Sequence, residues 1–335
     1  MNDDTFLQAD LQAEVQAPAP FTESESLVPP SDAQPKRFLP ALLLLLTFLS
    51  TLVAGFSFHV HFVTDYETNA LAELLEVWDD PAQILLGLPF ALTILIILLA
   101  HEMGHYLACR YYGIEATLPY AIPAPPILNP FGTFGAVIRI KSAFRDPRQL
   151  FDVGIAGPLG GFIFIIPALI IGLQNSKEFV FQAPVNEAWK FGEPLLFQWA
   201  ATLFYTGSAG STISLHPIGW AAWFGLLATS LNLLPIGQLD GGHIVYALFG
   251  TRGHRAVSYV TFVGLVLISL MSWPMLGYLL FAVIIVFLGF RHPPPRTELP
   301  PLGQGRWILA ILGLLIFLLS FIPLPIQLVS HVGRL

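Results

Sequence analysis

Two histidines and a glutamate stand at residues 101–105 with the spacing of a metal site. His101 and His105 are four residues apart, so on a helix they share one face and can bind the same Zn²⁺ ion. Glu102 can take a proton from water that the metal activates. These residues end the apolar run 84–100, where each ionisable side chain at mid-membrane costs roughly 2.5–3.5 kcal/mol. The pattern therefore predicts a hydrolytic metal site rather than an idle polar cluster.

A catalytic zinc ion usually has three protein ligands and a water molecule, so two histidines leave one ligand missing. Asp240 is the best candidate for the third ligand, because Pro235, Gly237, Gly241 and Gly242 break the apolar stretch around it. Such a break is tolerated at membrane depth only where the backbone faces protein or a watery cavity. The alternative is an ordinary Asp-Gly turn at the end of a helix.

The composition is that of a membrane protein. Apolar residues make up 55% of the 335 residues and charged residues 11%, which excludes a soluble globule. No basic tract suggests nucleic acid as a partner. Cys109 is the single cysteine, so an internal disulfide and a cysteine-based zinc cage are excluded. Segments long enough, or nearly so, to cross a membrane are 38–58, 83–109, 151–173, 219–237, 256–273, 275–290 and 307–329.

The basic residues predict how these segments are oriented. With the N-terminus in the cytoplasm, 12 of the 15 Lys and Arg residues lie on the cytoplasmic side, and Lys177, Lys190 and Arg334 lie outside. The second and fourth segments then both run inward, so the histidine motif and Asp240 reach the same depth. This agreement favours a ligand role for Asp240 over a simple turn.

Residues 1–36 are rich in Gln, Ala, Pro, Ser and acids and lack helical or strand periodicity. They predict a disordered cytoplasmic tail. The acidic leader and the late start of the first apolar run are atypical of a cleavable signal peptide or a chloroplast transit peptide. We therefore expect a bacterial membrane.

The region after the histidine motif predicts β-structure. Within Gly113–Leu150, prolines at 119, 123, 125, 126 and 130 precede the alternating stretch Gly132–Lys141, which is rich in Phe, Val and Ile. We expect a short strand or hairpin there. Its edge, at Val137 and Ile138, would hold an unwound substrate segment by strand addition. A buried structural hairpin fits the same pattern equally well.

Two motifs together resemble a known family. HEMGH at 101–105, followed by Asn-x-x-Pro-x-x-x-Leu-Asp-Gly-Gly at 232–242, is similar to the site-2 protease family of intramembrane zinc metalloproteases (M50-type). Residues 132–138 and 152–161 resemble the branch shared by cyanobacteria and plastids, which includes the plant proteins named for ethylene-dependent gravitropism deficiency and yellow-green leaves. The resemblance covers roughly residues 84–295.

The resemblance implies a role for each matching residue. His101, His105 and Asp240 would bind one Zn²⁺ ion per chain, and Glu102 would be the catalytic acid and base. Asn232 would contact the substrate or the transition state. The implied activity is that of a zinc metalloendopeptidase that hydrolyses peptide bonds within or near transmembrane segments, in regulated intramembrane proteolysis.

The predicted fold is an all-α polytopic membrane protein of about seven transmembrane helices, with a three-helix zinc-protease core formed by the second to fourth segments. Its parts are a peripheral helix at 38–58, a catalytic membrane core at 83–250, a helical pair at 256–290, a cytoplasmic loop at 291–306, and a C-terminal helix and tail at 307–335. The expected partners are a transmembrane protein substrate and the lipid bilayer, in the plasma or thylakoid membrane of a bacterium, such as a cyanobacterium. The pattern does not indicate an adaptor or an oligomeric state.

Three other functions compete with this interpretation. One is a metal-ion transporter in which Glu102 is itself a ligand. Another is a catalytically silent relative that acts as a membrane chaperone or scaffold, which the intact Glu102 and ligand set disfavour. The third is a membrane metalloprotease class with a downstream Glu ligand, and the absence of Glu between Glu115 and Glu178 disfavours it.

Overall fold

The structure, a computed structural model, describes residues 38–64, 80–180, 185–206, 211–271, 278–290 and 302–332. Within these ranges, four helical segments are long and apolar enough to cross a membrane. They are α1 (Phe38–Thr64), the 3₁₀ helix η2 (Pro81–Gly87) with α3 (Leu88–Tyr111), α4 (Pro147–Gln174) and α7 (Asp240–Met271). The tail predicted for 1–36 and most of the loop predicted for 291–306 lie outside the described residues.

The remaining helices are shorter. They are α5 (Leu195–Ala201), α6 (Pro217–Asn232), α8 (Leu279–Leu288) and α9 (Gln304–Ser320). The helix predicted for 307–329 is wrong at its end, because α9 stops at Ser320 and Ile326–Val332 forms the strand β6. Pro323 and Pro325 lie between these two elements, and proline cannot continue a helix.

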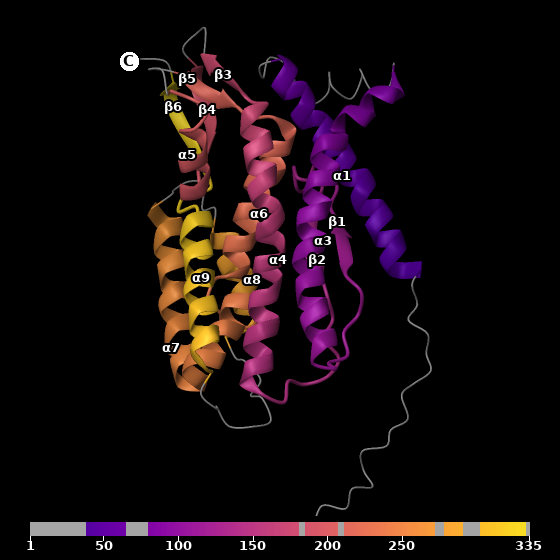
Figure 1. The fold of residues 1–335 in the computed structure, drawn as a ribbon. Coiled ribbons are helices and arrows are strands. Elements are labelled where there is room, and N and C mark those ends of the chain that lie inside the picture. Colours follow the sequence, from indigo (N-terminus) through magenta and orange to yellow (C-terminus); the bar gives the residue numbers. More distant parts are fainter. Residues whose placement is uncertain are drawn as a thin grey trace, which may run out of the picture. The chain divides into compact units, whose positions relative to one another are not determined.

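The predicted strand region after α3 is present as two short antiparallel strands. Strand β1 (Tyr120–Pro123) pairs with β2 (Thr133–Val137), with Tyr120 opposite Val137. Two further pairs are β3 (Lys177–Val180) with β5 (Ser211–Ser214), and β4 (Val185–Phe191) with β6. Figure 1 shows β3 to β6 and α5 gathered at one end of the helices, whereas β1 and β2 lie alongside α3.

Helix α4 occupies the centre of the helical body. It packs against α3, α6, α7 and α9, as Figure 1 shows for α3 and α9. Its first residue is Pro147, and the Asp146 carboxylate caps it by accepting a 2.7 Å hydrogen bond from the backbone N–H of Arg148. Asp146 and Pro147 thus start α4 a few residues before the part of the helix that faces the histidine motif.

Glycines bring α3 and α4 into close contact. A Cβ atom on Gly104 would lie 2.2 Å from the Ala156 carbonyl oxygen, and one on Gly160 would lie 2.6 Å from the Ala100 carbonyl oxygen. Side chains larger than hydrogen are therefore excluded at both positions. Small residues of this kind let membrane helices approach backbone to backbone.

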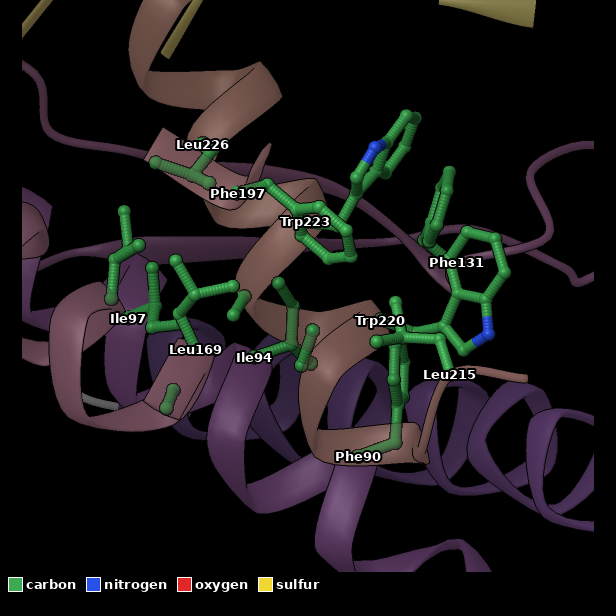
Figure 2. Packing of buried hydrophobic residues seen from close by; sticks show 14 of the residues in the cluster. Phe90, Ile94, Ile97, Phe131, Leu169, Phe197, Leu215, Trp220, Trp223 and Leu226 are labelled. Atoms are coloured by element: carbon green, nitrogen blue, oxygen red, sulfur yellow. The ribbon is translucent and has the colours of Figure 1, made fainter. Parts of the chain in front are cut away.

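Large side chains fill the opposite end of the same helices. Helices α3, α4 and α6 contribute Phe90, Leu169 and Trp220 to a buried cluster, which Figure 2 shows from close by. Phe131, from the segment between β1 and β2, packs into it with its ring centroid 5.9 Å from that of Trp223. The cluster thus ties the β1–β2 hairpin to α6.

The chain breaks between α6 and α7. The segment predicted as one helix over 219–237 ends at Asn232, and Asp240 begins the next helix. Pro235 and Gly237 lie in the intervening turn, and Gly237 has a φ of 55°, which favours glycine. Gly241 and Gly242, in contrast to the prediction, belong to α7 and do not interrupt it.

A second irregularity occurs inside α7 at Gly250, whose φ of 67° and ψ of −171° are not helical. After this point the chain runs back along the turn that precedes Asp240. His254 Nε2 lies 3.0 Å from the Gly237 carbonyl oxygen, and Ser258 Oγ donates a 3.2 Å hydrogen bond to the Pro235 carbonyl. The second part of α7 therefore supports the loop that delivers Asp240.

Candidate metal centre

Three side chains from two distant segments converge on one point. His101 and His105, one turn apart on α3, have their Nε2 atoms 3.1 Å from each other. Asp240, the first residue of α7, places Oδ2 3.2 Å from His101 Nε2 and Oδ1 3.4 Å from His105 Nε2. The structure thus brings together the three residues that the sequence singles out as ligands.

The orientation of His105 is fixed from outside this group. Its Nδ1 atom lies 2.7 Å from the backbone carbonyl oxygen of Val153 on α4, and only a protonated Nδ1 can donate to that oxygen. Nε2 then carries the lone pair of a neutral ring and points at Asp240. A second ring hydrogen bond of this kind is the usual way in which proteins orient a histidine that binds a metal.

Glu102 is buried beside the two histidines. One potential ligand atom from each of His101, Glu102 and His105 lies within 4.8 Å of the other two. The backbone of Ile138, directly after β2, lies close to the Glu102 carboxylate. The residue predicted as catalytic base is thus held against the end of the predicted substrate strand.

Asn232, the last residue of α6, also reaches the group. Its Nδ2 atom lies 3.3 Å from His101 Nε2. When that nitrogen binds a metal, its lone pair is used and the amide N–H is free to face a substrate. The break between α6 and α7 thus supplies two side chains, Asn232 before the turn and Asp240 after it.

The donor set fits a divalent metal ion. Two imidazole nitrogens and a carboxylate are ligands that zinc prefers, with one position left for water or substrate. Asp240 Oδ2 is buried and makes no hydrogen bond, although it faces His101. Several electron-rich atoms turned to one point repel each other unless a cation lies between them, so the arrangement suits a bound metal.

The sequence pattern does not predict two backbone contacts and one glycine contact of the site. The Val153 carbonyl and the Ile138 N–H carry no side-chain signal. Gly157 of α4 lies against the His105 ring, and a Cβ atom there would be 2.0 Å from Nε2. The run of small residues at 154–161 is the one signal that marks this close approach.

The predicted substrate strand lies next to the site. Arg139 N and O both pair with Thr117 on the β1 side, whereas the backbone of Ile138 lies close to Glu102. Because backbone groups alternate along a strand, Ala136 faces the same side as Ile138, and Val137 faces β1. Among the described residues, β2 pairs only with β1, so its other edge has no strand partner.

Comparison with known proteins agrees with the site. Residues 89–271, more than half of the chain, match the family described as "Peptidase family M50". "Probable zinc metalloprotease EGY1, chloroplastic" of Arabidopsis thaliana is 32% identical over 271 residues, which are 78% of this chain and 46% of that protein. The EGY2 protein of the same plant, with the same description, is 31% identical over 264 residues, 76% of this chain and 45% of that protein.

A more distant relative is "Probable zinc metalloprotease EGY3, chloroplastic" of Oryza sativa subsp. japonica, 26% identical over 254 residues, 70% of this chain and 42% of that protein. The chain spans a little under half the length of these relatives. The match over most of its membrane helices shows that the chain belongs to peptidase family M50. It is a largely helical protein of the membrane.

Proposed function

We propose that this chain is an intramembrane zinc metalloprotease that hydrolyses peptide bonds of membrane protein substrates. The observation that carries the proposal is the convergence of His101, His105 and Asp240 beside the buried Glu102. Family membership and the descriptions of the relatives support zinc as the metal. One ion per chain agrees with the one group of three ligands found among the described residues.

His101, His105 and Asp240 would hold the zinc ion. When bound, the ion supplies Lewis acidity that polarises the scissile carbonyl and acidifies water. Glu102 removes the proton from the attacking water and passes it to the leaving nitrogen. The Ile138 N–H, which lies close to the Glu102 carboxylate, would keep it in place during both transfers. Asn232, freed from His101, donates its amide to the carbonyl oxygen of the substrate.

A transmembrane substrate must unwind before it is cut, because the carbonyls of a helix are already hydrogen-bonded. The open edge of β2 would offer the N–H and the carbonyl of Ala136, and the carbonyl of Ile138, to an extended segment. The position of this edge beside Glu102 supports strand addition as the way in which the substrate is held. We accordingly expect segments with weak helix propensity to be cleaved best.

We infer that α6, α8 and α9 complete a body of about seven membrane-crossing elements around the four long spans. The organisation into a catalytic core at 83–250 and flanking helices is part of this proposal. The distribution of Lys and Arg supports an N-terminus on the cytoplasmic side. A bacterial plasma or thylakoid membrane is part of the same proposal, and the name chloroplastic belongs to the relatives.

The decisive experiment compares the full chain with its Glu102→Gln variant in lipid vesicles. The substrate is a single-span protein with a Gly-rich segment in its span. We expect Glu102→Gln to lose cleavage by about 10³-fold, since it cannot move protons, while zinc content by mass spectrometry stays at one ion per chain. Chelation should stop the wild type, and added Zn²⁺ should restore it.

Glu115→Gln is the matched control, because it makes the same change at an exposed residue beyond the end of α3. It should cleave as the wild type does. Cleavage by Glu102→Gln at the wild-type rate would refute the catalytic role. Zinc uptake into vesicles by a chain that cuts no peptide would refute the protease and favour a transporter.

A further inference from the structure

A second polar cluster lies where three elements meet, close to the metal centre. It joins Arg306 in the first turn of α9, Asp152 near the start of α4 and Tyr112 directly after α3. Arg306 Nε donates to Asp152 Oδ1 at 2.9 Å, and Nη2 donates to Oδ2 at 2.6 Å. Two such bonds between a planar guanidinium and a carboxylate fix the relative orientation of both groups.

Tyr112 closes the cluster. Its hydroxyl donates to Asp152 Oδ2 and accepts a 3.4 Å hydrogen bond from Arg306 Nη2. Burial and the neighbouring Asp152 carboxylate raise the pKa of Tyr112, so the phenol keeps its proton. The side chains of Arg306 and Asp152 are only 27% and 21% exposed, which shields their bonds from water more than those of a surface ion pair.

The cluster is one residue away from the metal centre along α4. Asp152 precedes Val153, whose carbonyl oxygen orients His105. The Val153 side chain is buried with Cys109 of α3 in a small apolar group against which Tyr112 packs. A shift of Tyr112 or Asp152 would thus move the carbonyl that holds the His105 ring.

Helix α9 is fixed against the same stretch of α4. Leu302, just before α9, and Ile316, within it, share a buried cluster with Phe151 and Ile155. A Cβ atom on Gly313 would lie 2.7 Å from Ile155 Cδ1, so the two helices touch closely. Arg306 lies beyond residue 271, where the match to the peptidase family ends.

We propose that Arg306 is a positioning residue for the metal centre, acting through Asp152 and Tyr112 to hold the Val153 carbonyl against His105. This proposal rests on the proposed zinc site. It gives a role in the active site to the C-terminal helix α9, which lies outside the region matched to the family. Cys109, the single cysteine of the chain, reports on the same region because it is fully buried beside Val153.

The test uses the full chain and three variants: Arg306→Gln, Arg306→Lys, and Arg255→Gln as the matched control at an exposed arginine of α7. Zinc affinity is measured by competition with a chromophoric chelator. We expect Arg306→Gln to bind zinc about tenfold more weakly, as for other groups that support a ligand. Arg306→Lys, which keeps the charge but not the paired donors, should lie between this variant and the wild type.

Maleimide labelling of Cys109 in metal-free protein gives a readout independent of zinc and of cleavage. We expect several-fold faster labelling of Arg306→Gln than of wild type, and unchanged labelling of Arg255→Gln. Wild-type zinc affinity and labelling rate in Arg306→Gln would overturn the positioning role. Should Arg306→Gln fail to fold, Arg306→Lys decides by the same two measurements. A wild-type chain that binds no zinc would instead refute the proposed function.

Discussion

The contact between α3 and α4 around His105 and the cluster around Trp220 are packed in opposite ways, although the same two helices take part in both. Around His105, glycines bring backbones together, and the backbones of Val153 and Ile138 lie against the side chains of His105 and Glu102. In the cluster around Trp220, aromatic and branched side chains fill the space between α3 and α4 (Figure 2).

This difference has a physical consequence. A backbone contact made through glycine leaves no room for one methyl group, whereas a cluster of large side chains can rearrange around a substitution of similar volume. Function should therefore be sensitive to small changes around His105 and tolerant of them around Trp220. The cluster around Trp220 should affect the free energy of unfolding instead.

Of the substitutions that test this contrast, Gly157→Ala should have the largest effect on zinc affinity. The new Cβ would lie 2.0 Å from His105 Nε2, so the ring must move and the ligand is displaced. We expect zinc affinity to fall by about 100-fold. Gly264→Ala is the control, because nothing lies within 4 Å of a Cβ at that helical position. Wild-type zinc affinity in Gly157→Ala would show that the two regions do not differ as described.

Asn232→Ala separates metal binding from catalysis within the region around His105. It removes an amide that lies 3.3 Å from His101 Nε2 but is not a predicted ligand. We expect kcat to fall by about 100-fold, as when one donor to a developing oxyanion is lost, with zinc affinity unchanged. Asn175→Ala, at the far end of α4, should leave both quantities as they are. An unchanged kcat would remove Asn232 from the site.

A proline at Ala136 tests whether the edge of β2 holds substrate. The substitution removes an N–H from the edge that faces Glu102. The hydrogen bonds on the side of the strand that faces β1 are unchanged. We expect kcat/KM to fall about fivefold, through KM, for the loss of one hydrogen bond. Val137→Thr keeps the backbone donor and should behave as wild type. Unchanged cleavage by a variant with the wild-type melting temperature would show that the β1–β2 hairpin is structural and does not hold the substrate.

The smallest effect on function is expected for Trp223→Phe in the cluster around Trp220. The substitution removes the 2.8 Å hydrogen bond from Nε1 to the Gly192 carbonyl but keeps most of the apolar volume. We expect the free energy of unfolding to fall by about 1 kcal/mol, measured by thermal or denaturant unfolding in detergent. Zinc affinity and kcat should change less than about twofold. A strong loss of zinc would contradict the tolerance of this region.

Much of the fold is predictable from local patterns. The apolar runs place α1, α3 and α4 within a few residues of their ends, and the prolines followed by alternation predict the β1–β2 region. The C-terminal segment is mispredicted because apolar content alone does not separate a helix from a strand. The last part of that segment pairs with β4, a partner more than 100 residues away in the chain.

The sequence by itself determines the donor atoms of the site. The spacing of His101 and His105 matches the helical repeat, and the Pro and Gly residues near Asp240 predict an interruption of the helix. Only the tertiary structure decides that the break ends before Asp240, so that this residue begins a helix and meets both histidines. Backbone donors and acceptors such as Val153 O and the Ile138 N–H are present at almost every residue, so packing alone selects which of them support a ligand.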